Sequence, residues 1–468
     1  MQKVHLDLNS KLETVLMFPE SRTALEKVLP EMAVLLEKQP SVQGFSLRRI
    51  VEYAKGAITQ EQSEQLNAAL GTLTIEAPEG IVPGETYSSD FPKTDAGAES
   101  KTGMMPYTSF APGQIWRDTE GKRIQAHGGA IWYEDGWYYW YGENKDHTDG
   151  KTAIWTWGIR CYRSKDLYNW EDLGLIIQPD LANPKSGLYP ENYLDRPHIV
   201  KCSSSDKYIC WAKLSGDIGA FIILEADRLT GPYTIIHDRY RPFDMEAGDF
   251  DIIISKEDGK AYLFEDGNHN GIYGIRLSDD YSSALEIVSR QYTGLHAPFC
   301  REGVTVFSEE NKYYMLTSGM TGYVPNRSDA AISENLRKPF LSIGDPHVND
   351  ASHASFNSQI TDVLHIENRK NAGGSDLLIA MADRWVPDYI MDGRKSEMYE
   401  RVTAMHFDPE HYHAAEEELQ EYMQSPMLES ADTSKSDYVW LPMTMEGGKP
   451  RIRWYDEWRI DLYEKGCR

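Results

Sequence analysis

Acidic and amide side chains recur through most of this 468-residue sequence, each beside a short run of aromatic and β-branched residues. These side chains are Gln125, Glu143, Asp195, Asp249, Asp251, Glu302 and Gln359, and His127 lies among them. Carboxyl groups that lie close together raise one another's proton affinity, so one can stay protonated while another is ionised. Glycosidic bond hydrolysis needs such a pair, a proton donor for the leaving oxygen and a group that acts on water or the sugar. The pattern favours a glycosidase, although any one of these residues alone would indicate a turn cap or a surface charge.

Aromatic residues, which bind the faces of sugar rings, are frequent in the same region. The tryptophans there are Trp116, Trp132, Trp137, Trp140, Trp155, Trp157, Trp211 and Trp385. We expect most of them to pack between strands and about two or three to meet a sugar.

A two-part pattern that occurs five times predicts the elements that position these side chains. A turn and an aromatic, β-branched strand are expected at 134–143, 205–213, 257–267, 310–319 and 375–385. A second strand-like stretch follows at 157–170, 219–233, 271–286, 327–340 and 402–410. Repeats of about 50 to 70 residues are typical of four-stranded propeller blades, and they fit a β-sandwich less well.

We therefore predict an all-β five-bladed β-propeller over residues 105–468. A late strand within 450–463 would close the ring or complete the fifth blade. Because a propeller gathers the starts of its innermost strands at one end of a central channel, the acidic and amide side chains are expected to meet there.

Residues 1–76 predict a small α-helical N-terminal domain. Apolar residues recur at helical spacing from Ser21, with Pro30 dividing or kinking the helix. A second helix is expected at 46–54, and a third from Thr59, with Gln62 completing a capping box. Residues 77–104 are rich in Pro, Gly, Ser and Thr and read as a linker. No chemistry is visible in this domain, which we interpret as a packing or interaction module.

The composition excludes several classes of partner. With 48 basic and 73 acidic residues the net charge is −25, which disfavours nucleic acid and anionic membranes and suits a neutral oligosaccharide. The five cysteines are odd in number and form no C-x-x-C pair, so reduced thiols are expected. The first residues do not resemble a signal peptide, so we expect a cytoplasmic protein. The oligomeric state is left open.

Seven ordered motifs resemble glycoside hydrolase family 43, in particular its exo-β-1,3-galactanase branch. In order they are Gln125-Ala-His-Gly-Gly-Ala with Tyr139-Trp-Tyr141-Gly-Glu143, Asp195-Arg-Pro-His (the branch's "ERPK"), Arg301-Glu302-Gly ("REAP"), Thr317-Ser-Gly-Met-Thr321-Gly-Tyr ("TSGxTGW"), Phe356-Asn-Ser-Gln359 ("FGSQ"), Asp383-Arg-Trp385 and Tyr438-Val-Trp-Leu-Pro442. The resemblance covers residues 105–463 and leaves the N-terminal region outside.

The resemblance implies a role for each matching residue. Glu302 matches the general acid, Asp195 the acidic residue that orients or tunes the site, and Gln359 the glutamine near the attacking water. The residues implied to bind the sugar are Glu143, Asp249, Thr321, Gln125, His127, Tyr141 and Trp385. Asp195 is shorter than the branch's Glu, and Gly303-Val304 replaces Ala-Pro after the acid.

The identity of the general base stays open, because no carboxylate stands at residues 125–127 where most of the family has an Asp. Gln359, Asp195 or Glu143 could position or activate water. No cofactor is required, and a structural calcium ion in the propeller channel is compatible with the resemblance. His127, His347 and His353 could be read as metal ligands, but a lone histidine near a strand start is more often a packing residue.

The implied activity is that of an exo-acting, inverting glycoside hydrolase releasing galactose from β-1,3-galactan-type oligosaccharides. Release of arabinofuranose, galactofuranose or xylose is the alternative within the family. A non-catalytic carbohydrate-binding propeller is the alternative of another class.

Overall fold

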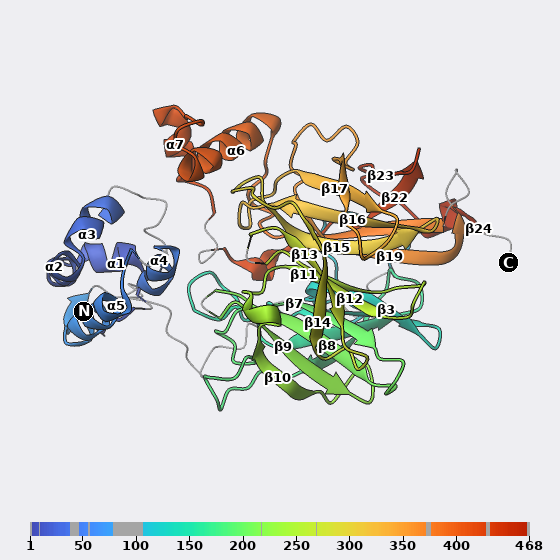
Figure 1. Cartoon of the computed structure of the whole chain (residues 1–468), viewed down its shortest axis with the longest axis horizontal. Coiled ribbons are helices and arrows are strands. Elements are labelled where there is room, and N and C mark those ends of the chain that lie inside the picture. Colours follow the sequence, from blue (N-terminus) through green and yellow to red (C-terminus); the bar gives the residue numbers. More distant parts are fainter. Residues whose placement is uncertain are drawn as a thin grey trace.

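The computed structural model of the chain shows five sheets arranged around a common axis, with a group of helices beside them (Figure 1). It describes residues 2–8, 10–37, 46–54, 57–77, 106–216, 218–267, 269–370, 376–426 and 431–465. This arrangement confirms the predicted all-β five-bladed β-propeller with an α-helical N-terminal region. The predicted linker at 77–104 lies outside the described residues, except for Ala77, which ends a strand.

Four of the blades are antiparallel sheets, each made from one continuous stretch of chain. Their strands are β3 (His127–Glu134), β4 (Trp137–Glu143), β5 (Ile159–Ser164) and β6 (Glu171–Ile177); β7 (Leu194–Lys201), β8 (Tyr208–Leu214), β9 (Ala220–Ala226) and β10 (Thr234–Tyr240); β11 (Phe250–Ile254), β12 (Ala261–Glu265), β13 (Ile272–Leu277) and β14 (Ala284–Gln291); and β15 (Arg301–Glu309), β16 (Lys312–Gly319), β17 (Ser328–Ser333) and β18 (Leu341–Gly344).

The fifth blade is interrupted by a helical excursion. Its strands are β19 (Gln359–Lys370), β20 (Asp376–Arg384), β21 (Asp437–Tyr438), β22 (Leu441–Glu446) and β23 (Lys449–Ile452), with β24 (Glu464–Lys465) pairing on β19. Helices α6 (Gly393–Phe407) and α7 (Glu416–Tyr422) lie between β20 and β21 and project from the propeller (Figure 1). The late strand predicted within 450–463 corresponds to β23, which completes the fifth blade.

The predicted strands agree with the structure in all but one case. The five aromatic stretches are the second strands of their blades, namely β4, β8, β12, β16 and β20. The prediction for 402–410 was wrong, because 402–407 belong to α6. Asp392 caps that helix by accepting the N–H of Lys395, and the buried Met398 and Val402 recur at helical spacing.

The ring closes through side-chain packing between the first and fifth blades. Trp140 and Tyr438 pack edge to face with ring centroids 4.5 Å apart, and Phe110 stacks on Trp458 at 4.4 Å. An ion pair of 2.8 Å joins Arg123 to Asp437. Of the eight tryptophans expected to divide between packing and sugar binding, Trp116, Trp132, Trp140 and Trp211 pack in the hydrophobic clusters of the propeller.

The N-terminal helices form a core of their own. They are α1 (Leu12–Met17), α2 (Pro19–Val28), α3 (Pro30–Glu37), α4 (Leu47–Tyr53) and α5 (Gln60–Gly71), joined by a two-stranded sheet of β1 (Gln2–Val4) and β2 (Ile75–Ala77). Pro30 begins α3 and so divides the predicted first helix. Both hydrogen bonds of the Thr59–Gln62 capping box are present.

Two expectations from composition can be compared with the described residues. Cys161, Cys202, Cys210 and Cys300 are free and buried, as expected for reduced thiols, and Cys467 lies outside the described ranges. Within those ranges, every helix is too short or too polar to cross a membrane.

Candidate active site

The predicted catalytic side chains converge at one end of the propeller channel. Asp195 and Glu302 are the second residues of the innermost strands β7 and β15, and Gln359 is the first residue of β19. Asp249 immediately precedes β11. Glu143 ends β4, which runs antiparallel to β3, so it reaches the same edge as the strand starts.

Arg196 links these residues, although sequence reasoning noted it only as the neighbour of Asp195. Its Nη2 donates to Gln359 Oε1 over 2.6 Å, and its Nε lies 3.0 Å from Asp249 Oδ2. Its backbone N–H donates to Glu143 Oε1 over 2.8 Å. The positive φ of 45° and the bulge at the start of β7 direct this buried residue into the channel.

Asp249 is a buried carboxylate held by two cations. Besides Arg196, Lys213 Nζ lies 2.5 Å from its Oδ1, and the N–H of Gly303 donates to its Oδ2. Burial raises the pKa of Asp249, but Arg196 and Lys213 outweigh burial and hold the pKa well below its usual range. Asp249 is therefore ionised at neutral pH. Lys213 lies at the end of a predicted strand, but nothing in the sequence connects this lysine to Asp249.

Glu302 has the opposite surroundings on the next blade. Burial raises the pKa of Glu302 well above its usual value, and the nearby carboxylates Asp249 and Asp266 raise it further. Among the described residues its one ion-pair partner is His269, with Nδ1 at 4.0 Å from Oε2. The side chain keeps 13% of its surface exposed. Glu302 can therefore hold a proton at neutral pH and present it to a ligand.

The amide of Gln359 is fixed in one orientation. Its Oε1 accepts hydrogen bonds from Arg196 and from Trp385 Nε1, which are groups that can only donate. Its Nε2 donates to Ser318 Oγ over 2.8 Å. One amide hydrogen remains for a water oxygen, so Gln359 can orient water but offers no basic atom.

Two further carboxylates lie on the first and second blades. Asp195 accepts hydrogen bonds from Trp155 Nε1 and from Ser215 Oγ. Glu143 Oε2 pairs with the buried Lys145 Nζ at 2.7 Å. Burial raises the pKa of Glu143 to about 7, with Lys145 opposing the shift. Either group could accept a proton.

A row of aromatic rings lies over this end of the channel. Trp155 is 4.7 Å from Tyr193 and 5.8 Å from Tyr323 between ring centroids, and Tyr323 is 5.3 Å from Trp385. A pocket is lined by Trp155, Tyr193 and Tyr323 together with Ala431 from the segment after α7. A second hollow beyond Tyr323 is lined by Gln359, Asp383 and Trp385. The row gives a sugar both an apolar face and a route to Gln359.

Three of the residues implied to bind sugar also make hydrogen bonds within and between the blades. His127 has no exposed surface, because Nδ1 pairs with Asp383 at 2.9 Å and Nε2 lies 3.0 Å from Gln125 Oε1. Gln125 in turn donates to the carbonyl of Ser434. Tyr141 lies between the first two blades and accepts the N–H of Ile199. These residues close the ring and position the blades, and their contact with a sugar stays a prediction.

Thr321 supports a loop at the mouth of the site. Its hydroxyl donates to the carbonyl of Val324 and accepts from Asn326 Nδ2, both over 2.6 Å. This arrangement shapes the loop that carries Tyr323.

Comparisons with known proteins agree with this geometry. A sequence profile of glycosyl hydrolases family 43 matches residues 126–359. Among solved structures, the GH43 β-1,3-galactosidase BT0265 is 27% identical with a TM-score of 0.60, and the match covers 76% of this chain and 64% of that one. The exo-β-1,3-galactanase of Phanerochaete chrysosporium with galactose is 22% identical with a TM-score of 0.58 (77% and 71% covered). That of Clostridium thermocellum is 22% identical with a TM-score of 0.57 (77% and 68% covered).

These matches bear on the chain to different degrees. The profile match spans half of the sequence and contains Glu143, Asp195, Asp249, Glu302 and Gln359. The two galactanases share the fold, and this chain spans less than two thirds of the length of BT0265. This chain therefore belongs to glycosyl hydrolase family 43, whose members hydrolyse O-glycosyl bonds.

Proposed function

We propose that this glycosidase acts on the ends of neutral β-1,3-linked galactooligosaccharides and releases galactose with inversion. The observation that carries the proposal is the unequal surroundings of two carboxyl groups at the channel end. Burial and nearby carboxylates raise the pKa of Glu302, while Arg196 and Lys213 pair with Asp249 and lower its pKa. The choice of sugar is supported by the similarity to a β-1,3-galactosidase at 27% identity.

The shape of the site supports attack at a chain end. The pocket beside Trp155 has walls from several separate segments, including Tyr193, Tyr323 and the residues after α7. A pocket walled in this way suits a terminal sugar better than the middle of a polymer. The acidic net charge suits a neutral substrate.

In the proposed mechanism Glu302 donates its proton to the glycosidic oxygen as the bond to the anomeric carbon breaks. A water oriented by the free amide hydrogen of Gln359 attacks that carbon from the other face. An amide forms no glycosyl ester, so direct attack by water and inversion follow. The proton released by the water goes to Asp195 or Glu143, the carboxylates that flank Arg196.

The decisive experiment compares Glu302→Gln with the wild-type enzyme on β-1,3-galactobiose. We expect a loss of about 10³-fold in kcat/KM, within the range for removal of a general acid. NMR of the first product should show the α-anomer of galactose. The matched control is Glu310→Gln, an exposed glutamate just beyond the far end of β15, which should keep the wild-type rate.

The same assay separates the alternatives. Cleavage of aryl arabinofuranosides, galactofuranosides or xylosides without cleavage of galactobiose would reassign the sugar. Binding of galactobiose without turnover of any substrate would make the chain a binding propeller. Asp195→Asn and Glu143→Gln, assayed with azide as an external nucleophile, distinguish the two candidate proton acceptors, since azide should restore only the variant that lacks the acceptor.

A further inference from the structure

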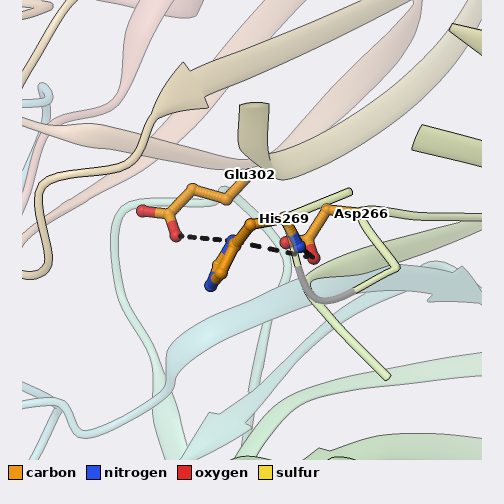
Figure 2. A group of neighbouring side chains, drawn as sticks. All are labelled: Asp266, His269 and Glu302. Carbon is orange, nitrogen blue, oxygen red and sulfur yellow. Dashed lines mark hydrogen bonds and ion pairs between the residues drawn. The ribbon is translucent and has the colours of Figure 1, made fainter. Parts of the chain in front are cut away.

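Asp266, His269 and Glu302 form a compact group on the acid side of the channel, here called the acid-side triad (Figure 2). Asp266 and His269 belong to the connection between β12 and β13, and Glu302 comes from β15 on the next blade. His269 Nδ1 lies 3.9 Å from Asp266 Oδ1 and 4.0 Å from Glu302 Oε2. All three atoms lie within 4.8 Å of one another.

These distances suit a shared metal ion. Around a tetrahedral ion with bonds of about 2.1 Å, neighbouring ligand atoms are about 3.4 Å apart. His269 Nδ1 is therefore only about half an ångström farther from each carboxylate oxygen than neighbouring ligands of one such ion would be. At 3.9 and 4.0 Å the same atoms are too far apart for hydrogen bonds.

The Nδ1 atom of His269 is held in place without a hydrogen-bond partner among the described residues. Nδ1 is buried and has no hydrogen-bond partner among the described residues, while 37% of the side chain stays exposed. The residue has a φ of 67°, a left-handed conformation that few non-glycine residues adopt. Asp266 is anchored as well, since it accepts the N–H groups of Asp249 and His269. The unpaired nitrogen points inward and the exposed edge of the ring gives an ion access.

The charge balance at the triad favours a cation. Arg196 and Lys213 are both within ion-pair distance of Asp249. For Asp266 and Glu302, His269 is the one ion-pair partner within the described part of the chain. Two carboxyl groups thus share one imidazole, and a cation that binds between them would replace the proton that Glu302 otherwise holds.

We propose that the acid-side triad binds a divalent transition-metal ion of the Zn²⁺ class and that the bound ion inhibits the enzyme by occupying Glu302. One imidazole nitrogen and two carboxylate oxygens are Zn²⁺ ligands that leave a fourth position for water. Ca²⁺ is disfavoured because it prefers six to eight oxygen ligands. The inhibitory half of this proposal rests on the proposed role of Glu302.

Calorimetric titration of the full chain with zinc sulfate tests the binding half. We expect one site in the wild-type protein and at least a tenfold weaker affinity in His269→Ala and Asp266→Asn. His411→Ala is the matched control, because His411 is 73% exposed and pairs with an aspartate three residues away. Equal zinc binding by wild type and His269→Ala, or equal binding of calcium and zinc by the wild type, would overturn the proposal. A thermal melt without metal checks that each variant is folded.

Activity measurements test the inhibitory half separately. Zinc should abolish galactobiose hydrolysis by the wild type and by His411→Ala, and His269→Ala should lose this sensitivity in proportion to its lost affinity. If zinc binds to the triad in the titration and hydrolysis continues, the inhibition is refuted while the metal site stands. If Glu302→Gln keeps the full hydrolytic rate in the absence of metal, the proposed function fails, independently of the titration.

Discussion

Asp249 and Glu302 lie near the starts of the innermost strands of adjacent blades, and little of either side chain is exposed, yet their neighbours differ. Asp249 is held by Arg196, Lys213 and the N–H of Gly303. Glu302 has carboxylates nearby and His269 at 4.0 Å. Similar desolvation therefore goes with opposite pKa shifts, because cations offset the cost of desolvation at Asp249 and do not offset it at Glu302.

This difference shows how one ring of carboxyl groups can contain both a proton donor and a fixed charge. The cations come from the second blade, which faces Asp249 more closely than Glu302. The ionisation of Asp249 thus depends on residues placed on another blade. Substitutions at six positions test the contrast between the surroundings of Asp249 and Glu302 and its consequences for the rest of the site.

The largest effect is expected from Asp249→Asn. This change leaves Arg196 and Lys213 buried without their counter-ion, and we expect a loss of about 3–5 kcal/mol in the free energy of unfolding. Glu302→Gln leaves no Lys or Arg unpaired and removes a carboxyl that is costly to ionise, so its stability should be unchanged or higher. Urea unfolding of both variants at pH 7 is the measurement. Similar losses of unfolding free energy in Asp249→Asn and Glu302→Gln would show that the surroundings of the two carboxyl groups do not differ in this way.

The pH dependence of stability is the next largest effect, and it concerns Glu143. Its pKa is about 7 in the folded protein against an ordinary 4.5, so its protonation stabilises the fold at low pH and that contribution is lost as the pH rises from 4.5 to 7. The stability of Glu143→Gln relative to wild type should therefore rise across this range, by up to about 3 kcal/mol. Unfolding curves at several pH values test this. A constant difference would place the folded pKa of Glu143 near its ordinary value.

Gln359→Ala tests the water side of the site. Losing the amide that orients water should lower kcat by about 10²-fold, comparable to removing one donor from a catalytic site. KM for galactobiose should change little, because the substrate's apolar contacts remain. Gln178→Ala, on the exposed end of the first blade, is the control and should behave as wild type. A normal kcat in Gln359→Ala would leave water positioning to another group.

Substitutions of two tryptophans should have the smallest effects on kcat/KM. They compare the hydrogen bond to the charged Asp195 with the one to the neutral Gln359. Trp155→Phe removes the indole hydrogen bond to Asp195, and Trp385→Phe removes the one to Gln359. Hydrogen bonds to a charged group contribute about 1.5–3 kcal/mol and neutral ones about 1 kcal/mol, so we expect roughly tenfold and fivefold losses in kcat/KM. Trp132→Phe is the control, because its indole nitrogen has no hydrogen-bond partner within the described ranges. Equal effects of all three would indicate a packing role.

The sequence alone determined the blades and the position of the acid. The aromatic strands repeat at a regular spacing, and strand periodicity is a local property, so Glu302, Asp195 and Gln359 could be placed at strand starts. The Thr59 capping box was predictable for the same reason, since it depends on residues three apart. Helix α6 was missed because its strand-like stretch was read without the cap at Asp392.

Which groups surround each site residue depends on the tertiary structure and could not be predicted from the sequence. The partners of His127 and Tyr141 are Asp383 and Ile199, which lie far along the chain and are brought near only by the packing of the blades. The ionisation of Asp249 and Glu302 likewise depends on Arg196 and Lys213, which lie many residues away in sequence. Charge interactions act through space and change steeply with distance and burial, so the order of residues along the chain does not contain them.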